Sequence, residues 1–216
     1  MEPTLSDLIV DARVKVGSFS LDARLRAKPG VTVLFGPTAS GKTLTLRLVA
    51  GVLRPTSGSI RFGDAVFDDG HAFVPPHARG LGFAPQDGAL WLHRDVRAHL
   101  SPFAAPARVG ELLALVGLEP HADRRPHDLS GGERQRLAFA RALARKSALL
   151  SFDEPFSALD DESRKKMGSI VRAEAERGAT ILFVTHDREE ATRLGDAFVL
   201  FRDGHTEETN RLRPAE

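Results

Sequence analysis

One run of glycine, hydroxyl and lysine residues has the spacing of a phosphate-binding loop. Residues 36–43 match the pattern G-x-x-x-x-G-K-[ST]. In such a loop glycines let the backbone approach a polyanion closely, and N–H groups at a helix start point at the phosphates. We expect Lys42 to contact the β- and γ-phosphates and the Thr43 hydroxyl to ligate Mg²⁺. The residues expected to cradle a nucleoside triphosphate are Gly36, Pro37, Thr38, Ala39, Ser40, Gly41, Lys42 and Thr43.

Two adjacent carboxylates follow an apolar stretch in the second half of the chain. The segment reads Ser151-Phe152-Asp153-Glu154-Pro155. Carboxylates at the carboxyl end of a strand lie where open α/β sheets bind ligands. Asp153 is expected to hold Mg²⁺, and Glu154 to polarise a water that attacks the γ-phosphate. By itself the pair is equally typical of a solvated acidic turn, but the phosphate loop favours the catalytic interpretation.

A third motif, Leu129-Ser130-Gly131-Gly132-Glu133-Arg134-Gln135, opens a helical stretch. Ser130 is expected to cap that helix, with Glu133 at its third position, and this interpretation needs no ligand. Gly131 and Gly132 would also let an anion approach free N–H groups. The chain would then carry two phosphate-binding elements for one nucleotide. A nucleotide shared between two subunits resolves that excess.

The elements that must position these motifs follow from the hydrophobic pattern. A β-branched run leads into the phosphate loop, and helical spacing follows it until Gly51. Polar and apolar residues alternate on both sides of Gly17-Ser18, which predicts two paired strands. The expected strands in this half are 8–16, 19–25, 31–35, 59–62 and 65–67, with a helix over 44–50 and a turn over 55–58.

The remainder of the chain divides into a helical zone and an alternating zone. Residues 95–145 are rich in Ala, Arg and Leu, and an apolar helix face there ends at Gly117. From Leu149 onward strands over 149–152, 180–185 and 197–201 alternate with helices over 162–177 and 188–194. Such alternation predicts an α/β fold with a mostly parallel sheet and crossover helices.

Composition narrows the classes of function. The 216 residues are 42% hydrophobic and 27% charged, which is typical of a globular protein. A net charge of +1 offers no electrostatic case for nucleic-acid binding. The chain has no cysteine, which excludes disulfides and thiolate chemistry. No apolar run approaches the roughly 20 residues that span a bilayer, so we expect no direct membrane insertion.

Taken together, the motifs resemble the ATP-binding subunit of an ABC transporter. Five elements occur in order: the Walker A loop GPTASGKT, Gln86 in FAPQ, the signature LSGGERQ, the Walker B segment LLSFDEP, and His186 in FVTHD. The resemblance implies a P-loop NTPase of the ABC type over residues 1–216, as one domain. It further implies an N-terminal antiparallel β-subdomain and an inserted helical subdomain at about 95–145.

The resemblance also implies roles for residues that spacing alone does not assign. ATP bound to Lys42 and Thr43 of one subunit would meet the signature residues of a second, in a head-to-tail homodimer or heterodimer. Gln86 would contact Mg²⁺ or the attacking water, and His186 the γ-phosphate. Asp160, in the D-loop Ser157-Ala158-Leu159-Asp160, would lie at the dimer interface. Phe19 is the candidate for stacking on adenine, although a core phenylalanine fits the position equally well.

Within this family the segments 67–70, 74–79 and 86–100 look like molybdate-importer ATPases. Trp91, His93 and Val96 fit an aromatic-x-His-x-x-Val pattern that helps receive a membrane permease, so permease subunits are expected to dock near residues 86–100. Trp91 would either be exposed for that contact or packed. The resemblance implies a cytoplasmic ATPase, peripheral on the inner membrane face, for molybdate or a similar oxyanion and without the usual C-terminal regulatory domain.

Several residues depart from the family pattern, and alternative functions stay open. Ala39 stands where glycine is usual, Leu92 where proline is usual, and Ser151 interrupts the apolar Walker B strand. The alternatives are an importer ATPase for another small solute, a non-transport ABC-type ATPase, and a regulatory module that has lost hydrolysis. Intact Lys42 and Glu154 speak against the last of these.

Overall fold

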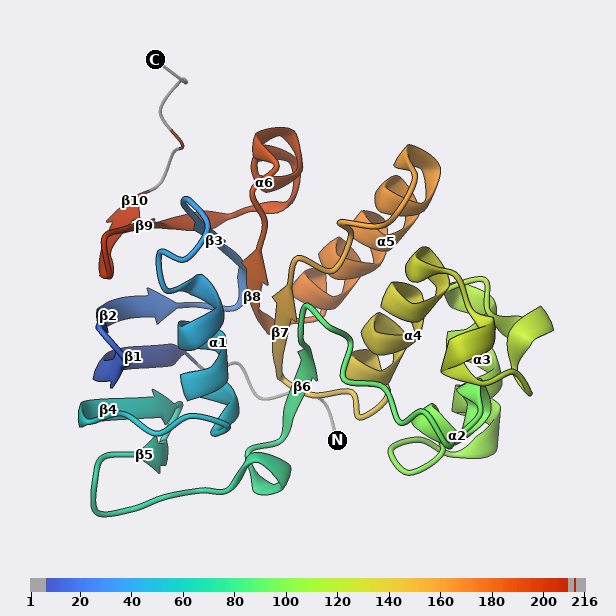
Figure 1. The fold of residues 1–216 in the computed structure, drawn as a ribbon, viewed down its shortest axis with the longest axis horizontal. Coiled ribbons are helices and arrows are strands. Elements are labelled where there is room, and N and C mark those ends of the chain that lie inside the picture. Colours follow the sequence, from blue (N-terminus) through green and yellow to red (C-terminus); the bar gives the residue numbers. More distant parts are fainter. Residues whose placement is uncertain (1–6, 210–211, 213–216) are drawn as a thin grey trace.

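A single mixed sheet organises the protein. The computed structural model describes residues 7–209 and residue 212, and within them ten strands form one sheet in the order β5-β4-β1-β2-β10-β9-β3-β8-β7-β6 (Figure 1). The strands are β1 (Leu8–Val16), β2 (Phe19–Ala27), β3 (Gly30–Phe35), β4 (Ser57–Phe62), β5 (Ala65–Asp68), β6 (Leu81–Ala84), β7 (Leu149–Asp153), β8 (Thr180–Val184), β9 (Ala197–Arg202) and β10 (His205–Thr209). The α-helices are α1 (Lys42–Ala50), α2 (Val96–Leu100), α3 (Pro106–Leu115), α4 (Gly131–Leu143), α5 (Asp161–Glu176) and α6 (Arg188–Leu194). Short 3-10 turns lie at Pro76–Ala78, Glu119–His121 and Pro126–Asp128.

The sheet has a parallel half and an antiparallel half. Strands β9, β3, β8, β7 and β6 pair in parallel, whereas β5, β4, β1 and β2 pair antiparallel. Strand β10 joins the halves, because it is antiparallel to β9 and meets β2 in parallel at His205 and Asp22. This arrangement confirms the predicted fold class. The joining strand β10 was not predicted, since its sequence HTEET has no apolar residue to mark a buried face.

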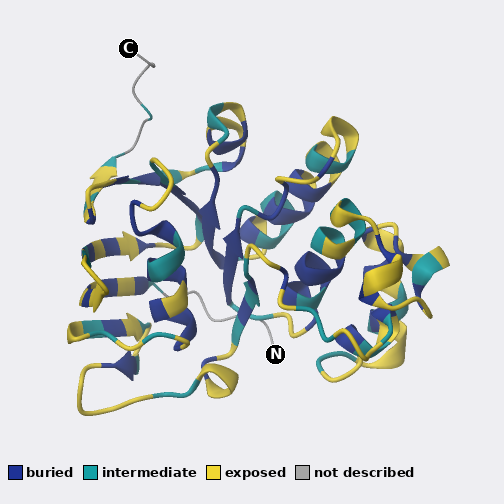
Figure 2. Ribbon diagram, in the orientation of Figure 1, coloured by how far each residue is buried: buried dark blue, intermediate teal, exposed yellow. Residues whose placement is uncertain are grey.

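Burial explains why the halves differ in sequence. Strand β1 alternates buried Leu8, Val10, Ala12 and Val14 with exposed residues, as expected for a sheet with one solvated face. Strands β7 and β8 are instead buried at every position, because helices cover both of their faces (Figure 2).

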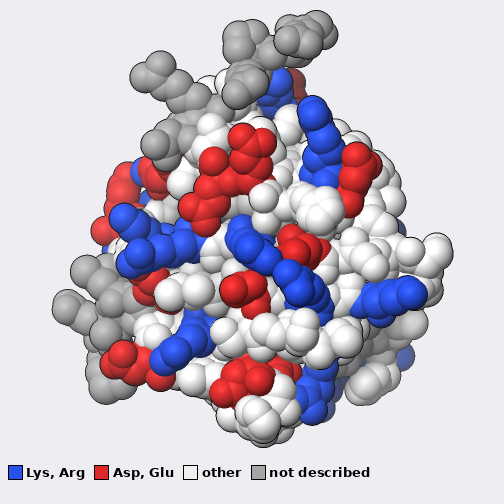
Figure 3. All heavy atoms as spheres, turned by 90° about the vertical axis from the view of Figure 1, so that its left-hand side faces the viewer, with Lys and Arg blue, Asp and Glu red and all other residues white. Residues whose placement is uncertain are grey.

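Ion pairs between neighbouring strands cover the solvated face of the antiparallel half. The Arg13 guanidinium lies 3.1 Å from the Asp22 carboxylate, and Arg26 lies 2.6 Å from Asp7. Lys and Arg are interspersed with Asp and Glu on this side of the molecule (Figure 3). Opposite charges therefore compensate one another locally across the strands.

Two hydrophobic cores lie on opposite faces of the parallel strands. Along β8, Ile181 and Phe183 face a core that includes residues of α4, α5 and α6. Leu182 and Val184 face the other core, which contains α1 and the inner side of β1 and β2. Helix α1 is thus enclosed between the two halves of the sheet, which fixes the loop that precedes it.

The structure corrects the prediction for residues 55–58. We expected a turn there, but β4 begins at Ser57. Gly58 pairs with Ala12 of β1, where a Cβ atom would come within 2.0 Å of the Asp11 carbonyl oxygen. Glycine therefore serves close strand pairing here, and the prediction of a four-residue turn was wrong. Within the described part of the chain, no helix combines the length and apolar character needed to cross a bilayer.

Candidate nucleotide site

The loop between β3 and α1 is folded around its own lysine. Gly41 precedes α1 with a φ of 112°, and a Cβ atom there would lie 2.7 Å from the Leu21 side chain. The Lys42 Nζ donates hydrogen bonds to the carbonyl oxygens of Gly36 at 2.8 Å and Pro37 at 2.6 Å. The Lys42 ammonium therefore closes the loop. A bound polyanion would compete with these two carbonyl oxygens for the ammonium.

The crown of this loop combines exposed backbone with one strained residue. Pro37, Thr38 and Ala39 are exposed. Ala39 has a φ of 61°, in the left-handed region that favours glycine. The Ser40 hydroxyl is buried, and its oxygen lacks a hydrogen-bond partner among the described residues. Backbone N–H groups and an unpartnered hydroxyl at a helix start make a site suited to anionic oxygens.

Burial and nearby carboxylates have opposite effects on the pKa of Lys42. Its side chain is mostly buried, and this burial lowers the pKa of the ammonium, while the nearby carboxylates of Glu154 and Asp153 raise it in opposition. A partly desolvated cation attracts phosphate more strongly than one in bulk water.

Asp153 ends strand β7 beside the start of α1. The Thr43 hydroxyl donates a 3.2 Å hydrogen bond to Asp153 Oδ1, while Oδ2 is buried without a partner in the described structure. Burial, reinforced by the neighbouring Glu154 charge, raises the pKa of the Asp153 carboxyl above its ordinary value. Hydroxyl and carboxylate oxygens are the ligands that Mg²⁺ prefers, so the pair fits that ion. No group of three or more His, Cys, Asp or Glu residues that could hold a metal ion occurs in the part of the chain that the structure describes.

Glu154 faces His186 across the carboxyl edge of the parallel strands. The Glu154 Oε2 atom lies 3.2 Å from His186 Nδ1, and the side chains are 20% and 70% exposed. Glu154 has a φ of 47°, and its N–H donates to the Val184 carbonyl oxygen. The left-handed backbone turns the carboxylate away from the strand direction that Asp153 follows. The structure thus brings Lys42, Thr43, Asp153, Glu154 and His186 to one edge.

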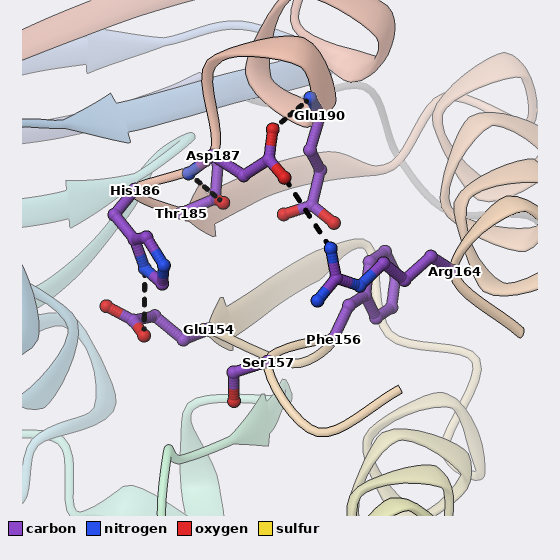
Figure 4. A pocket seen from close by; sticks show the side chains of 8 residues that line it. All are labelled: Glu154, Phe156, Ser157, Arg164, Thr185, His186, Asp187 and Glu190. Carbon is purple, nitrogen blue, oxygen red and sulfur yellow. Dashed lines mark hydrogen bonds and ion pairs between the residues drawn. The ribbon is translucent and has the colours of Figure 1, made fainter. Parts of the chain in front are cut away.

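A pocket beside this pair contains residues that the sequence did not single out. Its lining residues are Glu154, Phe156, Ser157, Arg164, Thr185, His186, Asp187 and Glu190 (Figure 4). Asp187 caps α6 by accepting from the Glu190 N–H, and that D-x-x-E spacing is a signal that could have marked both residues. Burial raises the pKa of the Glu190 carboxyl, against a lowering by its hydrogen bond with Thr185.

The predicted cap of the signature helix is confirmed. Glu133 N–H donates to Ser130 Oγ at 3.3 Å, and Ser130 N–H donates to Glu133 Oε2 at 2.6 Å. His121 Nε2 lies 2.9 Å from the second oxygen of Glu133. Ser130 and Gly131 are exposed, and no hydrogen bond or ion pair among the described residues joins the 130–132 segment to the 36–43 loop. The segments 36–43 and 130–132, both predicted to bind phosphate, are thus not directly bonded to each other within the described chain.

The other residues expected in the site occupy separate positions. Gln86 follows β6 and is exposed. Asp160 caps α5, accepting from Ser163 N–H at 2.8 Å and from the Ser163 hydroxyl. Phe19 is half-buried beside the β9–β10 turn, where its ring lies 3.4 Å from a Cβ position built on Gly204.

Trp91 is half-buried, which lies between the two positions expected for it, exposed or packed. The Trp91 ring stacks on His99 at a centroid distance of 5.3 Å, and the backbone N–H of Trp91 donates to His99 Nε2 at 2.9 Å. His99 Nδ1 lies 2.7 Å from the Asp95 carbonyl oxygen, and burial lowers the pKa of this imidazole. His99 therefore acts as a neutral bridge within the 86–100 segment, while Leu92 is 69% exposed.

The parallel sheet, the loop at the start of α1 and the carboxylates at the end of β7 define a P-loop nucleotide-binding protein of the α/β class. The family described as ABC transporter matches residues 22–157. The chain belongs to the ABC transporter family.

Known proteins of two substrate classes are similar to this chain. A Fe(3+) ions import ATP-binding protein of Pseudomonas fluorescens is 43% identical over 182 residues, covering 80% of this chain and 51% of that protein. A molybdenum import ATP-binding protein of Brucella abortus is 39% identical over 209 residues, covering 93% of this chain and 58% of that protein. The chain thus spans little more than half the length of these relatives.

A solved structure supports the fold independently of these relatives. The dimeric structure of a bacterial ABC transporter cassette superposes with a TM-score of 0.83 at 24% sequence identity, covering 94% of this chain and 98% of that one. At this identity the likeness concerns the fold.

Proposed function

We propose that this chain is the ATP-binding and ATP-hydrolysing subunit that energises an ABC importer. The observation that carries the proposal is the Glu154–His186 pair, which lies at the same sheet edge as Lys42 and Asp153. A carboxylate, an imidazole and a buried ammonium at one edge supply a base, a γ-phosphate contact and a charge for the phosphates. The same edge is where open parallel sheets bind their ligands.

Each residue has a defined part in this proposal. The loop 36–43 and Lys42 hold the β- and γ-phosphates, Glu154 accepts a proton from the attacking water, and His186 contacts the γ-phosphate. Thr43, Asp153 and Gln86 would hold Mg²⁺, which when bound offsets the negative charge of the phosphates. Phe19 remains the candidate for the adenine contact.

Exposure of the signature supports a shared site. Ser130 and Gly131 lie open at the start of α4, and Gly132 is only partly covered. We propose that these three residues and Asp160 meet the nucleotide of a second subunit, in a head-to-tail dimer. The free N–H groups of α4 would then complete the phosphate site of the partner.

The transported solute and the membrane partner are also proposals. Relatives named for molybdenum and for Fe(3+) import are similarly close, so they do not choose between the two solutes. We keep molybdate or a similar oxyanion as the first candidate, because the segments 67–70, 74–79 and 86–100 look like molybdate-importer ATPases. Another small solute is the second candidate. A non-transport ATPase is the remaining alternative. Exposed Leu92, His93 and Arg94 support a permease contact within residues 86–100, which would place the chain on the inner membrane face. The continuous sheet supports one ABC ATPase domain over residues 1–216, with residues 95–145 as its helical part.

Replacing the proposed base tests the catalytic assignment. Glu154→Gln keeps the shape of the side chain but removes its basicity, so we expect ATP affinity to stay within about two-fold while kcat falls roughly 10²-fold or more. Equilibrium ATP binding and steady-state phosphate release measure the two quantities. Lys42→Ala is the control, because it removes a phosphate contact and should weaken ATP binding itself. A Glu154→Gln enzyme that turns over like the wild type would rule out Glu154 as the base.

A further inference from the structure

We propose that Arg164 is a positioning residue that holds the turn carrying His186 against the segment 157–160. The inference rests on the proposed function, in which His186 contacts the γ-phosphate. Arg164 itself touches no reacting group. It lies on the first turns of α5, between two loops that are distant in the sequence.

The Arg164 guanidinium bonds to both loops. Its Nε donates a 3.1 Å hydrogen bond to the Leu159 carbonyl oxygen. Its Nη1 lies 3.6 Å from Asp187 Oδ2, and Asp187 directly follows His186 (Figure 4). The planar fork of arginine makes such a two-sided contact in a fixed geometry, which lysine does not reproduce.

Apart from the His186–Glu154 pair, the hydrogen bonds found for the His186 turn among the described residues are local ones. Asp187 N–H donates to Thr185 Oγ1 at 3.0 Å, and Asp187 Oδ1 accepts from Glu190 N–H at 3.0 Å. Thr185 and Glu190 are buried, so the base of the turn is rigid. His186 projects from the turn with an exposed ring. Arg164 adds to the Glu154–His186 pair a second contact between the turn and another element, and this one reaches the side chain of Asp187, next to His186, and not the imidazole ring.

The segment on the other side of Arg164 is tied to the signature helix. Gln135 Nε2 of α4 donates to Ser157 Oγ at 2.6 Å, and Gln135 Oε1 accepts from Ala158 N–H at 2.8 Å. A continuous set of bonds therefore runs from α4 through residues 157–159 and Arg164 to Asp187. A displacement of the signature helix would reach His186 along this set.

We expect the loss of Arg164 to change the position of His186 more than the free energy of unfolding. Partly exposed ion pairs contribute little to stability, and Arg164 is 33% exposed. A small misplacement of a group that contacts the reacting phosphate nevertheless costs a large factor in rate. Loss of Arg164 should therefore appear in kcat and in the environment of His186.

The chain offers a matched control on the same helix. Arg172 is 34% exposed, donates to the Leu194 carbonyl oxygen at 3.0 Å and pairs with Asp196 at 2.7 Å. Like Arg164, it contacts one backbone carbonyl oxygen and one aspartate. These partners lie just before the start of β9, whereas those of Arg164 follow the carboxyl ends of β7 and β8. Arg172→Gln should match the stability cost of Arg164→Gln without disturbing His186.

The first test is independent of ATP hydrolysis. Ring resonances of isotope-labelled histidine are recorded for the nucleotide-free wild type, Arg164→Gln and Arg172→Gln, with His186 assigned from the spectrum of His186→Gln. We expect the His186 signals to move or broaden in Arg164→Gln and to keep their wild-type positions in Arg172→Gln. Unchanged His186 signals in Arg164→Gln, or equal shifts in both variants, would overturn the positioning role.

The second test separates chemistry from binding. In Arg164→Gln we expect kcat for ATP hydrolysis to fall about 10-fold or more with KM within about two-fold, whereas Arg172→Gln keeps both. Asp187→Asn should show a similar loss, and the double variant should lose no more than either one. Additive losses would overturn the proposal. A wild type without ATPase activity would refute the proposed function instead, and the histidine spectra would then decide the role of Arg164.

Discussion

Two residues of the site adopt a backbone conformation that glycine tolerates best. Ala39 and Glu154 have φ values of 61° and 47°, although both carry a Cβ atom. For Glu154 the strained turn aims the carboxylate at His186, so the conformation is part of the arrangement. Ala39 carries an exposed methyl group at the crown of the loop, and its side chain makes no contribution that would compensate the strain.

We therefore predict that Ala39→Gly stabilises the protein. Relief of the left-handed strain is worth about 1–2 kcal/mol, and the greater freedom of glycine in the unfolded chain returns about 0.4–1 kcal/mol. The expected net gain is about 0.5–1 kcal/mol in the free energy of unfolding, measured by urea denaturation. Ala114→Gly is the control, because Ala114 is exposed within α3 and glycine there should destabilise. A loss of stability in both variants would contradict the strain argument.

Residues with a local pattern were predictable from the sequence, whereas residues that act across the fold were not. Lys42, Asp153 and Ser130 lie in motifs whose spacing implies their surroundings. Arg164 and His99 lie among other helical residues, and their partners come from separate turns of the chain. No short-range pattern marks such contacts, since only the packed sheet brings the segments together.

At the scale of elements, helix α1 is held at both ends. Its first turn closes the phosphate loop, and at its last turn Arg79 Nη1 donates to the carbonyl oxygens of Leu48 and Val49, each at 2.8 Å. Arg79 also bonds to the Val74 and Phe67 carbonyl oxygens. The β5–β6 connection thereby caps the helix that carries the site.

The Asp68 carboxylate is fully buried, and its salt bridge with Arg54 orders that connection. Arg54 donates two hydrogen bonds to this carboxylate, at 3.0 and 3.1 Å, and Gly70 N–H donates a third. Burial raises the pKa of Asp68, but the hydrogen bonds and charge of Arg54 outweigh it, so the net pKa lies below its ordinary value. The ionised carboxylate therefore stabilises the fold above the unfolded-state pKa, and this contribution disappears as pH falls through the folded-state pKa.

Asp68→Asn should consequently destabilise the protein at neutral pH by about 1–3 kcal/mol, because one charge and its hydrogen bonds are lost while the half-exposed Arg54 regains water. Urea denaturation at pH 7 and at successively lower pH measures the difference from the wild type. That difference should narrow as the pH falls toward the folded-state pKa of Asp68. Asp64→Asn, at an exposed position in the preceding turn, should show no comparable effect at pH 7. A difference that is constant with pH would exclude the charge as its cause.

At the scale of the molecule, the two segments predicted to bind phosphate differ in how they are placed. The phosphate loop closes around Lys42, while Ser130 and Gly131 face solvent on α4. The sequence alone predicted two phosphate-binding motifs for one nucleotide, and this pointed to a site shared between subunits. The sequence did not carry the path of contacts through Gln135 and Arg164 that links helix α4 to the turn carrying His186 within one subunit.

If two subunits share each site, two inactive variants should restore activity when mixed. Gly131→Asp places a negative charge against the partner's phosphates. The variant should still fold, because a Cβ atom at residue 131 lies 3.8 Å from Ala158 and an acid suits the first turn of a helix. A heterodimer of Gly131→Asp with Lys42→Ala has one site with an intact loop and an intact signature. We expect each variant alone to be nearly inactive, and an equimolar mixture to hydrolyse ATP at least several-fold faster than the two separate rates combined.

The arrangement of the dimer decides the outcome, since a head-to-tail geometry alone pairs the loop of one chain with the signature of the other. A double variant carrying both changes is the matched control: mixed with the wild type, it forms heterodimers in which each composite site has one damaged half. That mixture should show a decline in activity as the double variant is added. No gain in the first mixture, together with a wild-type rate that the double variant leaves unchanged in the second, would show that each chain completes its own site, provided that circular dichroism finds all variants folded.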